Sequence, residues 1–139
     1  PNVVTGAPPI LEASGVWQRC QVVAGDFLRS VPAGADAYIL KHILHDWDDA
    51  RASAILQNCR KAMAPGASLL IIERIMPEKV ESGQAVEAYL LDLEMLVRTP
   101  GGRERSEAEF RDILSDCGFA MTRVVPTSAP ISVIEAQAV

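Results

Sequence analysis

A nearly continuous apolar run in the middle of the chain, ASLLIIERIM at residues 67–76, constrains the fold more than any other feature. Strands of a parallel sheet are apolar along most of their length because helices cover both faces of the sheet. The run is also shorter than the roughly 20 apolar residues that a membrane-spanning helix needs. The sequence therefore predicts a buried strand within an α/β domain.

Glycine and proline divide the rest of the chain into alternating strand-like and helix-like segments. The other predicted strands are 20–27, 37–43, 120–128 and 131–138, and the last two are expected to form an antiparallel hairpin. The predicted helices are 48–64, 87–98 and 106–118. This order of elements indicates a mostly parallel, doubly wound sheet within one domain of 139 residues.

Two of the helices have recognisable starts. Asp48 suits the N-cap of the first helix. Ser106 with Glu109 three residues later matches a capping box at the start of the last helix. The first helix also carries one apolar stripe, formed by Ala52, Ile55, Leu56, Cys59 and Met63. These local signals predict stable helices that pack one face against the sheet.

Charge and cysteine content exclude several classes of protein. The net charge of −5 and the sequence pI of about 5.0 argue against nucleic-acid binding, which usually needs a basic surface. No signal-like segment opens the chain, and no membrane helix is predicted. The three cysteines are odd in number and widely spaced, which is typical of reduced thiols in a cytoplasmic protein.

Ionisable residues follow several of the predicted strands. Asp26 ends the first, Lys41 and His45 lie at the end of the second, and Glu73 interrupts the apolar run. Ligands of α/β sheets bind beyond the carboxyl ends of the strands, so this edge is the expected site. Structural alternatives remain open, because Asp26 fits a simple turn and a buried Glu73 could belong to a structural salt bridge.

His42 and His45, three residues apart, raise the question of a metal site. A zinc ion needs three or four nitrogen, sulfur or carboxylate ligands in a tetrahedral array. We expect the two side chains to diverge at the strand end, so we predict no metal site, with His42 packed at the sheet edge. His45 is either structural or a general base, since an imidazole pKa near 6.5 suits proton transfer.

Four segments in order then resemble the C-terminal catalytic part of the S-adenosylmethionine-dependent small-molecule O-methyltransferases, of the plant caffeate and isoflavone type and their bacterial relatives. They are GDF at 25–27, LKHILHDWDD at 40–49, IIERIMPE at 71–78 and TPGGRERSEAEFRDIL at 99–114. The resemblance implies a Rossmann-like class I methyltransferase fold with the strand order 3-2-1-4-5-7-6. The present chain matches strands 3 to 7 and lacks the first two.

The resemblance also implies roles for individual residues. His45 matches the catalytic base, and Glu73 and Glu104 match two carboxylates that flank and orient its ring. The positions matching cofactor contacts are Asp26, Phe27 and Lys41, and those matching acceptor contacts are Asp46, Met95 and Thr99. The implied reaction uses S-adenosylmethionine, releases S-adenosylhomocysteine and methylates a hydroxyl of a phenolic or polyketide-like molecule.

Several parts of the family pattern are missing. The chain shows no glycine-rich cofactor loop, no acid for the cofactor ribose and no N-terminal dimerisation domain, and it begins with Pro1 rather than methionine. We therefore expect a fragment of a homodimeric enzyme that is inactive by itself, with weak or no cofactor binding and unpaired sheet edges. The alternative is a non-catalytic, methyltransferase-like interaction subunit. A nicotinamide-dependent oxidoreductase is disfavoured because no GxGxxG motif follows a strand.

Overall fold

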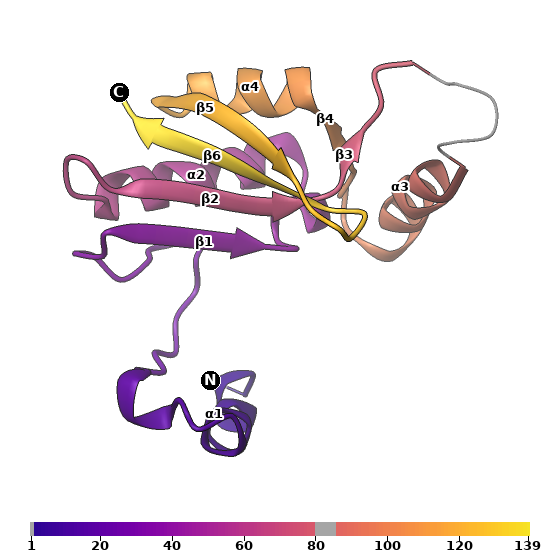
Figure 1. The fold of residues 1–139 in the computed structure, drawn as a ribbon. Coiled ribbons are helices and arrows are strands. Elements are labelled where there is room, and N and C mark those ends of the chain that lie inside the picture. The colour runs from indigo at the N-terminus through magenta and orange to yellow at the C-terminus, as the bar shows by residue number, and fades with distance from the viewer. Residues whose placement is uncertain (1, 80–85) are drawn as a thin grey trace.

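The computed structural model describes residues 2–79 and 86–139, which form a mixed α/β structure around one four-stranded sheet (Figure 1). The sheet order is β1-β2-β6-β5, with the bounds β1 Ala37–Lys41, β2 Ser68–Glu73, β6 Ser132–Ala138 and β5 Phe119–Pro126. β1 and β2 pair in parallel, whereas β6 pairs antiparallel with both β2 and β5. The predicted C-terminal hairpin is confirmed, and the order equals the 4-5-7-6 part of the order implied by the resemblance.

The helices end close to their predicted limits. Their bounds are α2 Asp49–Ala62, α3 Val86–Arg98 and α4 Glu107–Asp116. Asp48 caps α2 by accepting a hydrogen bond from the backbone N–H of Arg51 at 2.8 Å. Ser106 and Glu109 form the complete capping box at the start of α4. Both predicted N-termini are therefore confirmed.

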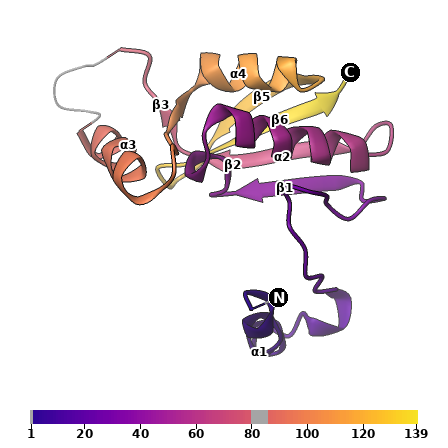
Figure 2. The same cartoon turned by 180° about the vertical axis from the view of Figure 1, so that it is seen from behind.

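The core lies between the sheet and the two helices α2 and α4, which cover the same face (Figure 2). Ile55, Leu56, Leu69, Leu114 and Ile134 are completely buried there. Along β2, burial alternates with a period of two, and Leu69, Ile71 and Glu73 point to the helix-covered side. The strand alternation therefore carries Glu73 into the protein interior at the carboxyl end of β2.

Two strand predictions were wrong: no strand forms at 20–27, and the run 67–76 is not one strand. Residues 20–26 have no regular structure, because the described residues provide no neighbouring strand whose hydrogen bonds could hold them extended. The apolar run 67–76 is divided at Arg74. Its last part, β3 (Ile75–Met76), leaves the main sheet and pairs in parallel with β4 (Arg105–Ser106). This small sheet brings the loop before α4 next to the end of β2.

The N-terminal residues form helical turns that the sequence did not predict. A 3₁₀ turn at Val4–Gly6 leads into α1 (Ala7–Ala13), and a second 3₁₀ turn follows at Trp17–Arg19. Figures 1 and 2 show α1 away from the sheet, joined to it by the extended segment before β1. Among the described helices, none has the length and apolarity to cross a membrane.

Candidate active site

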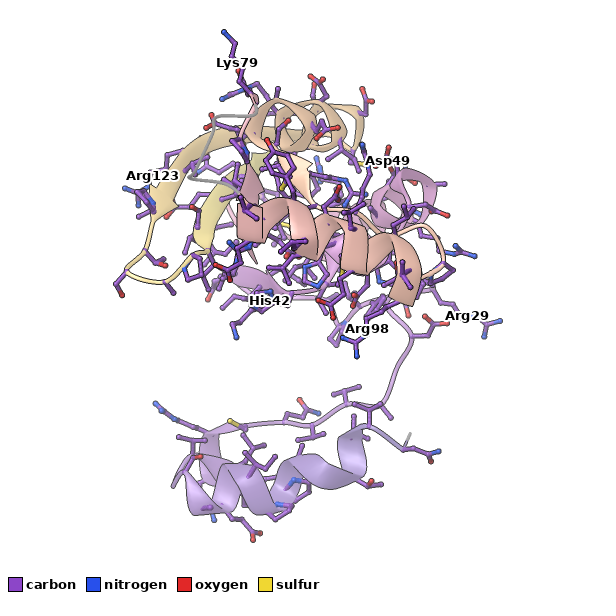
Figure 3. The ribbon with its side chains drawn as sticks, turned by 90° about the vertical axis from the view of Figure 1, so that its right-hand side faces the viewer. Arg29, His42, Asp49, Lys79, Arg98 and Arg123 are labelled. Carbon is purple, nitrogen blue, oxygen red and sulfur yellow. The ribbon has the colours of Figure 1, made fainter. Side chains whose placement is uncertain are left out.

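The carboxyl ends of the parallel strands β1 and β2 meet at one edge of the sheet, which faces the viewer in Figure 3. The backbone N–H of His42 extends the strand pairing by bonding to the carbonyl of Ile72 at 3.1 Å. His42 itself has a φ of 52°, and the chain then turns through a short 3₁₀ helix, η3 (Leu44–Asp46). This reversal places His45 above the end of β2, next to Glu73.

Glu73 holds this turn from the inside of the protein. One carboxylate oxygen, Oε1, accepts hydrogen bonds from the backbone N–H groups of Ile43 and Leu44, each at 2.9 Å. The other oxygen, Oε2, lies 2.7 Å from Nδ1 of His45. A carboxylate can remain in a fully buried position when such bonds replace its hydration. Glu73 therefore fixes both the backbone and the ring of the predicted base.

The environment of His45 favours its protonated form. The hydrogen bond to Glu73 raises the pKa of His45 above its ordinary 6.5, and the negative charges of Glu73, Glu104 and Asp46 add to the effect, although burial opposes it. Because Nδ1 faces the carboxylate of Glu73, a neutral ring keeps its proton on Nδ1. The lone pair is then on Nε2, so this nitrogen is the one able to accept a proton.

Glu104 approaches the same ring from the loop before β4. Its Oε1 lies 4.0 Å from Nδ1 of His45, so both glutamates lie on the Nδ1 side of the ring and do not bracket it from opposite edges. Asp92 fixes this position by accepting a hydrogen bond from the N–H of Glu104 at 2.8 Å. Burial raises the pKa of Glu104, with a further contribution from the charge of Glu73, while the charge of His45 lowers it. Its Oε2 is buried without a hydrogen-bond partner among the described residues.

Asp46 lies on the other side of the imidazole. Its Oδ1 is 3.5 Å from Nε2 of His45, and its side chain is 47% exposed. A hydroxyl group that gives its proton to Nε2 would therefore lie beside the carboxylate of Asp46. This position is compatible with the predicted contact to the acceptor.

The loop between α3 and β4 packs directly against the backbone of the His45 turn. Thr99 closes its start: the hydroxyl donates to the carbonyl of Met95 at 2.8 Å and accepts from the N–H of Gly102 at 2.7 Å. The two predicted acceptor residues Met95 and Thr99 thus lie at the end of α3 and are partly buried. The hydroxyl of Thr99 is used within the loop, so its fixed role in this structure is to shape the loop.

Gly102 is a close-packing position that the sequence analysis missed. A Cβ atom there would lie 2.3 Å from the carbonyl oxygen of His45 and 2.8 Å from the carbonyl carbon of Asp46. It would also lie 2.3 Å from the hydroxyl of Thr99. Two of these neighbours are backbone atoms, which cannot rotate away as a flexible side chain can. The pair of glycines in the GGRER segment was the available signal, since glycine permits close backbone approach.

We expect Gly102→Ala to lower the free energy of unfolding by about 1–3 kcal/mol, the usual cost of overpacking. The measurement is urea unfolding of the variant and the parent chain. Gly25→Ala is a matched control, because a Cβ at Gly25 meets no atom within 4 Å and the residue has no positive φ. An unchanged unfolding midpoint for Gly102→Ala would contradict the close packing of this loop.

The expected divergence of the two histidines was wrong. The positive φ of His42 and the turn after it bring the ring centroids of His42 and His45 to 5.5 Å. One ligand atom from each of His42, His45 and Glu73 lies within 4.8 Å of the other two. A metal would have to replace the 2.7 Å hydrogen bond between His45 and Glu73. That no metal binds remains a prediction.

The three predicted cofactor residues come from the end of β1 and from the loop before that strand. Lys41 ends β1 and is exposed. Asp26 is exposed and its Oδ1 accepts a hydrogen bond from the N–H of Leu28 at 3.0 Å, which fits the turn that the sequence analysis left open. Phe27 packs edge-on against Trp47 with ring centroids 6.0 Å apart. The segment 26–27 is therefore anchored against Trp47, two residues after His45, even though it is not part of a strand.

Known proteins resemble this chain along most of its length. A family model described as "O-methyltransferase domain" matches residues 1–120. O-demethylpuromycin-O-methyltransferase from Streptomyces alboniger is 49% identical over 138 residues, covering 98% of this chain and 36% of that protein. Caffeic acid 3-O-methyltransferase from Zea mays is 39% identical over 121 residues, covering 86% of this chain and 31% of that protein.

A solved structure of similar fold contains ligands. The O-methyltransferase NcsB1 of neocarzinostatin biosynthesis, in complex with S-adenosylmethionine and 2-hydroxy-5-methyl naphthoic acid, superposes with a TM-score of 0.85 at 35% identity. The match covers 98% of this chain and 38% of NcsB1. The chain therefore spans about a third of the length of its curated relatives, and it has the fold of the corresponding part of NcsB1.

Proposed function

The chain belongs to the O-methyltransferase domain family, and from this premise we propose that it forms the catalytic part of an enzyme that methylates a hydroxyl group. The proposed donor is S-adenosylmethionine, and the proposed acceptor is a phenolic or polyketide-like small molecule. The single observation that carries the proposal is the 2.7 Å contact between Nδ1 of His45 and buried Glu73, which leaves Nε2 available as a base.

Lys41 at the end of β1, with Asp26 and Phe27 in the loop whose Phe27 packs against Trp47, fits the proposed methyl donor chemically. Lys41 offers a cation, Asp26 a carboxylate that can accept hydrogen bonds, and Phe27 an aromatic ring that can pack against an adenine. These three residues would hold the nucleoside part of the donor. When bound, S-adenosylmethionine supplies an electrophilic methyl group.

His45 solves the main chemical difficulty of the acceptor, which is that a neutral hydroxyl is a weak nucleophile. Moving a proton from a phenol with a pKa of about 10 to an imidazole with a pKa near 6.5 costs a free energy of roughly 5 kcal/mol. The bond to Glu73 and the nearby carboxylates raise the pKa of His45 and so lower this cost. The acceptor proton moves to Nε2, while Glu73 stabilises the resulting imidazolium through Nδ1.

Positioning is the second contribution of these residues. Asp46 lies beside Nε2 and can hold the acceptor hydroxyl in line with the base. Glu104 adds negative charge on the Nδ1 side of the ring, which favours the imidazolium. The acceptor class is proposed from the relatives, since NcsB1 was solved with a hydroxylated naphthoic acid and the plant relative is named for caffeic acid.

The test is methyl transfer by the full-length protein with trideuteromethyl-labelled S-adenosylmethionine and a panel of phenolic and polyketide acceptors. We expect mass spectrometry to find the labelled methyl group on an acceptor oxygen. Acceptors whose hydroxyl groups are already methylated serve as the matched control and should gain no label. Binding of the donor without transfer to any acceptor would instead favour the non-catalytic interaction subunit.

Three further expectations belong to the same proposal. The full-length protein is expected to act as a homodimer in the cytoplasm. The residues of this chain alone are expected to bind S-adenosylmethionine weakly or not at all, because the family's glycine-rich loop has no counterpart in their sequence. Titration calorimetry with the chain, and with the full-length protein in parallel, tests this last point.

A further inference from the structure

We propose that Arg105 is a positioning residue for the base, because its buried guanidinium sets the orientation of the turn that carries His45. The inference rests on the proposed function of His45. The contacts of Arg105 from which it is argued are structural observations that do not depend on that function. Arg105 is 1% exposed and is the largest side chain among the fully buried residues that the structure describes. A charge in such a place is costly unless its donors are bonded.

The donors of Arg105 are bonded to the two ends of the His45 turn. Nη1 donates to the carbonyl of Leu44, the residue before His45, at 2.8 Å. Nη2 donates to the carbonyl of Trp47, two residues after it, at 2.9 Å. The planar guanidinium therefore spans the turn and fixes the distance between its ends, which a lysine ammonium cannot do with the same geometry.

Asp49 fixes the guanidinium in turn. Its Oδ1 accepts from Nε of Arg105 at 3.1 Å and from Nη2 at 2.8 Å. These bonds and the charge of Arg103 hold the pKa of Asp49 below its ordinary value, although burial opposes the shift. Since Asp49 is the first residue of α2, hydrogen bonds through Arg105 connect the start of that helix to the His45 turn.

Arg105 and Glu73 bind the same turn through complementary backbone groups. Glu73 accepts the N–H groups of Ile43 and Leu44, whereas Arg105 donates to carbonyl groups of the turn. The two are linked through the small sheet, because Arg105 pairs with Ile75, two residues beyond Glu73. Glu104, next to Arg105 in sequence, is thereby also placed near His45. The adjacent residues Glu104 and Arg105 thus supply a carboxylate near the ring and hydrogen bonds to the backbone of the turn.

Loss of the hydrogen bonds from Arg105 to Leu44 and Trp47 should weaken the bond between His45 and Glu73. In Arg105→Lys of the full-length protein we expect the single-turnover methyl-transfer rate to fall about 10- to 100-fold, the range that a misplacement of about 1 Å can cause. The acid limb of the rate profile should move to lower pH, because the bond that raises the pKa of His45 is weaker. The titratable groups that face His45 are Glu73, Glu104 and Asp46, and the ring centroid of His42 lies 5.5 Å from that of His45.

A second variant guards against misfolding of Arg105→Lys. Asp49→Asn removes the charge that orients the guanidinium at a site that is 60% exposed, so its fold should persist. We expect the same shift of the acid limb with a smaller loss of rate. Arg111→Gln is the matched control, since Arg111 is exposed and bonds only Glu107 one turn away on α4 in the described structure. It should keep the parent rate and pH profile.

The downfield proton resonance of Nδ1–H of His45, assigned by its loss in His45→Gln, gives a readout independent of activity. We expect it to weaken or shift in Arg105→Lys and Asp49→Asn. If the methyl-transfer rate of the variants falls by the same factor at every pH and the Nδ1–H resonance is unchanged, Arg105 has a purely structural role and the proposal is overturned. Parent behaviour of both variants would overturn it as well. Parent turnover in His45→Gln would instead refute the proposed function, while the resonance still reports on Arg105.

Discussion

His45→Ala in the full-length protein should lower the methyl-transfer rate by about 10²–10⁴-fold, the usual contribution of a general base. The loss is expected in the rate and not in donor affinity, because Asp26, Phe27 and Lys41 remain in place. In the parent protein the rate should fall as the pH decreases through the raised pKa of His45, that is, above pH 6.5, since only the neutral ring accepts a proton. The variant should lack this limb.

The measurement is single-turnover transfer across pH, together with titration of S-adenosylmethionine. His42→Asn is the matched histidine change on the same strand end, and asparagine tolerates the positive φ of that position. Its effect should be much smaller, because His42 lies 3.8 Å from Glu73 and is not hydrogen-bonded to it. Equal losses in the two variants, or parent turnover in His45→Ala, would remove His45 from the mechanism.

Glu73→Gln should reduce the rate nearly as strongly while the fold persists. The amide oxygen of glutamine can still accept the N–H groups of Ile43 and Leu44, but its amide nitrogen then faces Nδ1 of His45. Two donors cannot bond, so the ring must move its proton to Nε2 and can no longer accept one there. The equivalent carboxylate-to-amide change in Ser-His-Asp triads costs about 10⁴-fold.

Urea unfolding separates this chemical effect from a structural one. Glu73→Leu is the comparison, because leucine leaves the buried N–H of Leu44 and the partly buried N–H of Ile43 without an acceptor, and a buried donor left unsatisfied costs about 1–3 kcal/mol. Glu73→Gln should therefore be inactive but close to parent stability, whereas Glu73→Leu should be both inactive and destabilised. An active Glu73→Gln would show that the tautomer of His45 does not matter for transfer.

The candidate site was predicted in part from the residues and in part from the resemblance. The rule that ligands bind beyond parallel strand ends indicated Lys41, His45 and Glu73, whose strands the structure brings side by side. Glu104 came from the resemblance alone, because it is far from His45 in sequence and no periodicity connects them. Arg105 and Gly102 were missed, although both lie within the recognised GGRER segment.

The sequence alone determined those features that are stabilised by interactions between residues close together in the chain. The capping groups Asp48 and Ser106 and the apolar run of β2 act within a few residues, so the helix starts and the central strand could be predicted. Tertiary structure decided whatever needed a distant partner. Residues 20–26 are not a strand because no described strand pairs with them, and the apolar run divides because Ile75 pairs with Arg105. The position of His45 depends in the same way on Glu73 and Arg105, since hydrogen bonds between distant segments orient the turn.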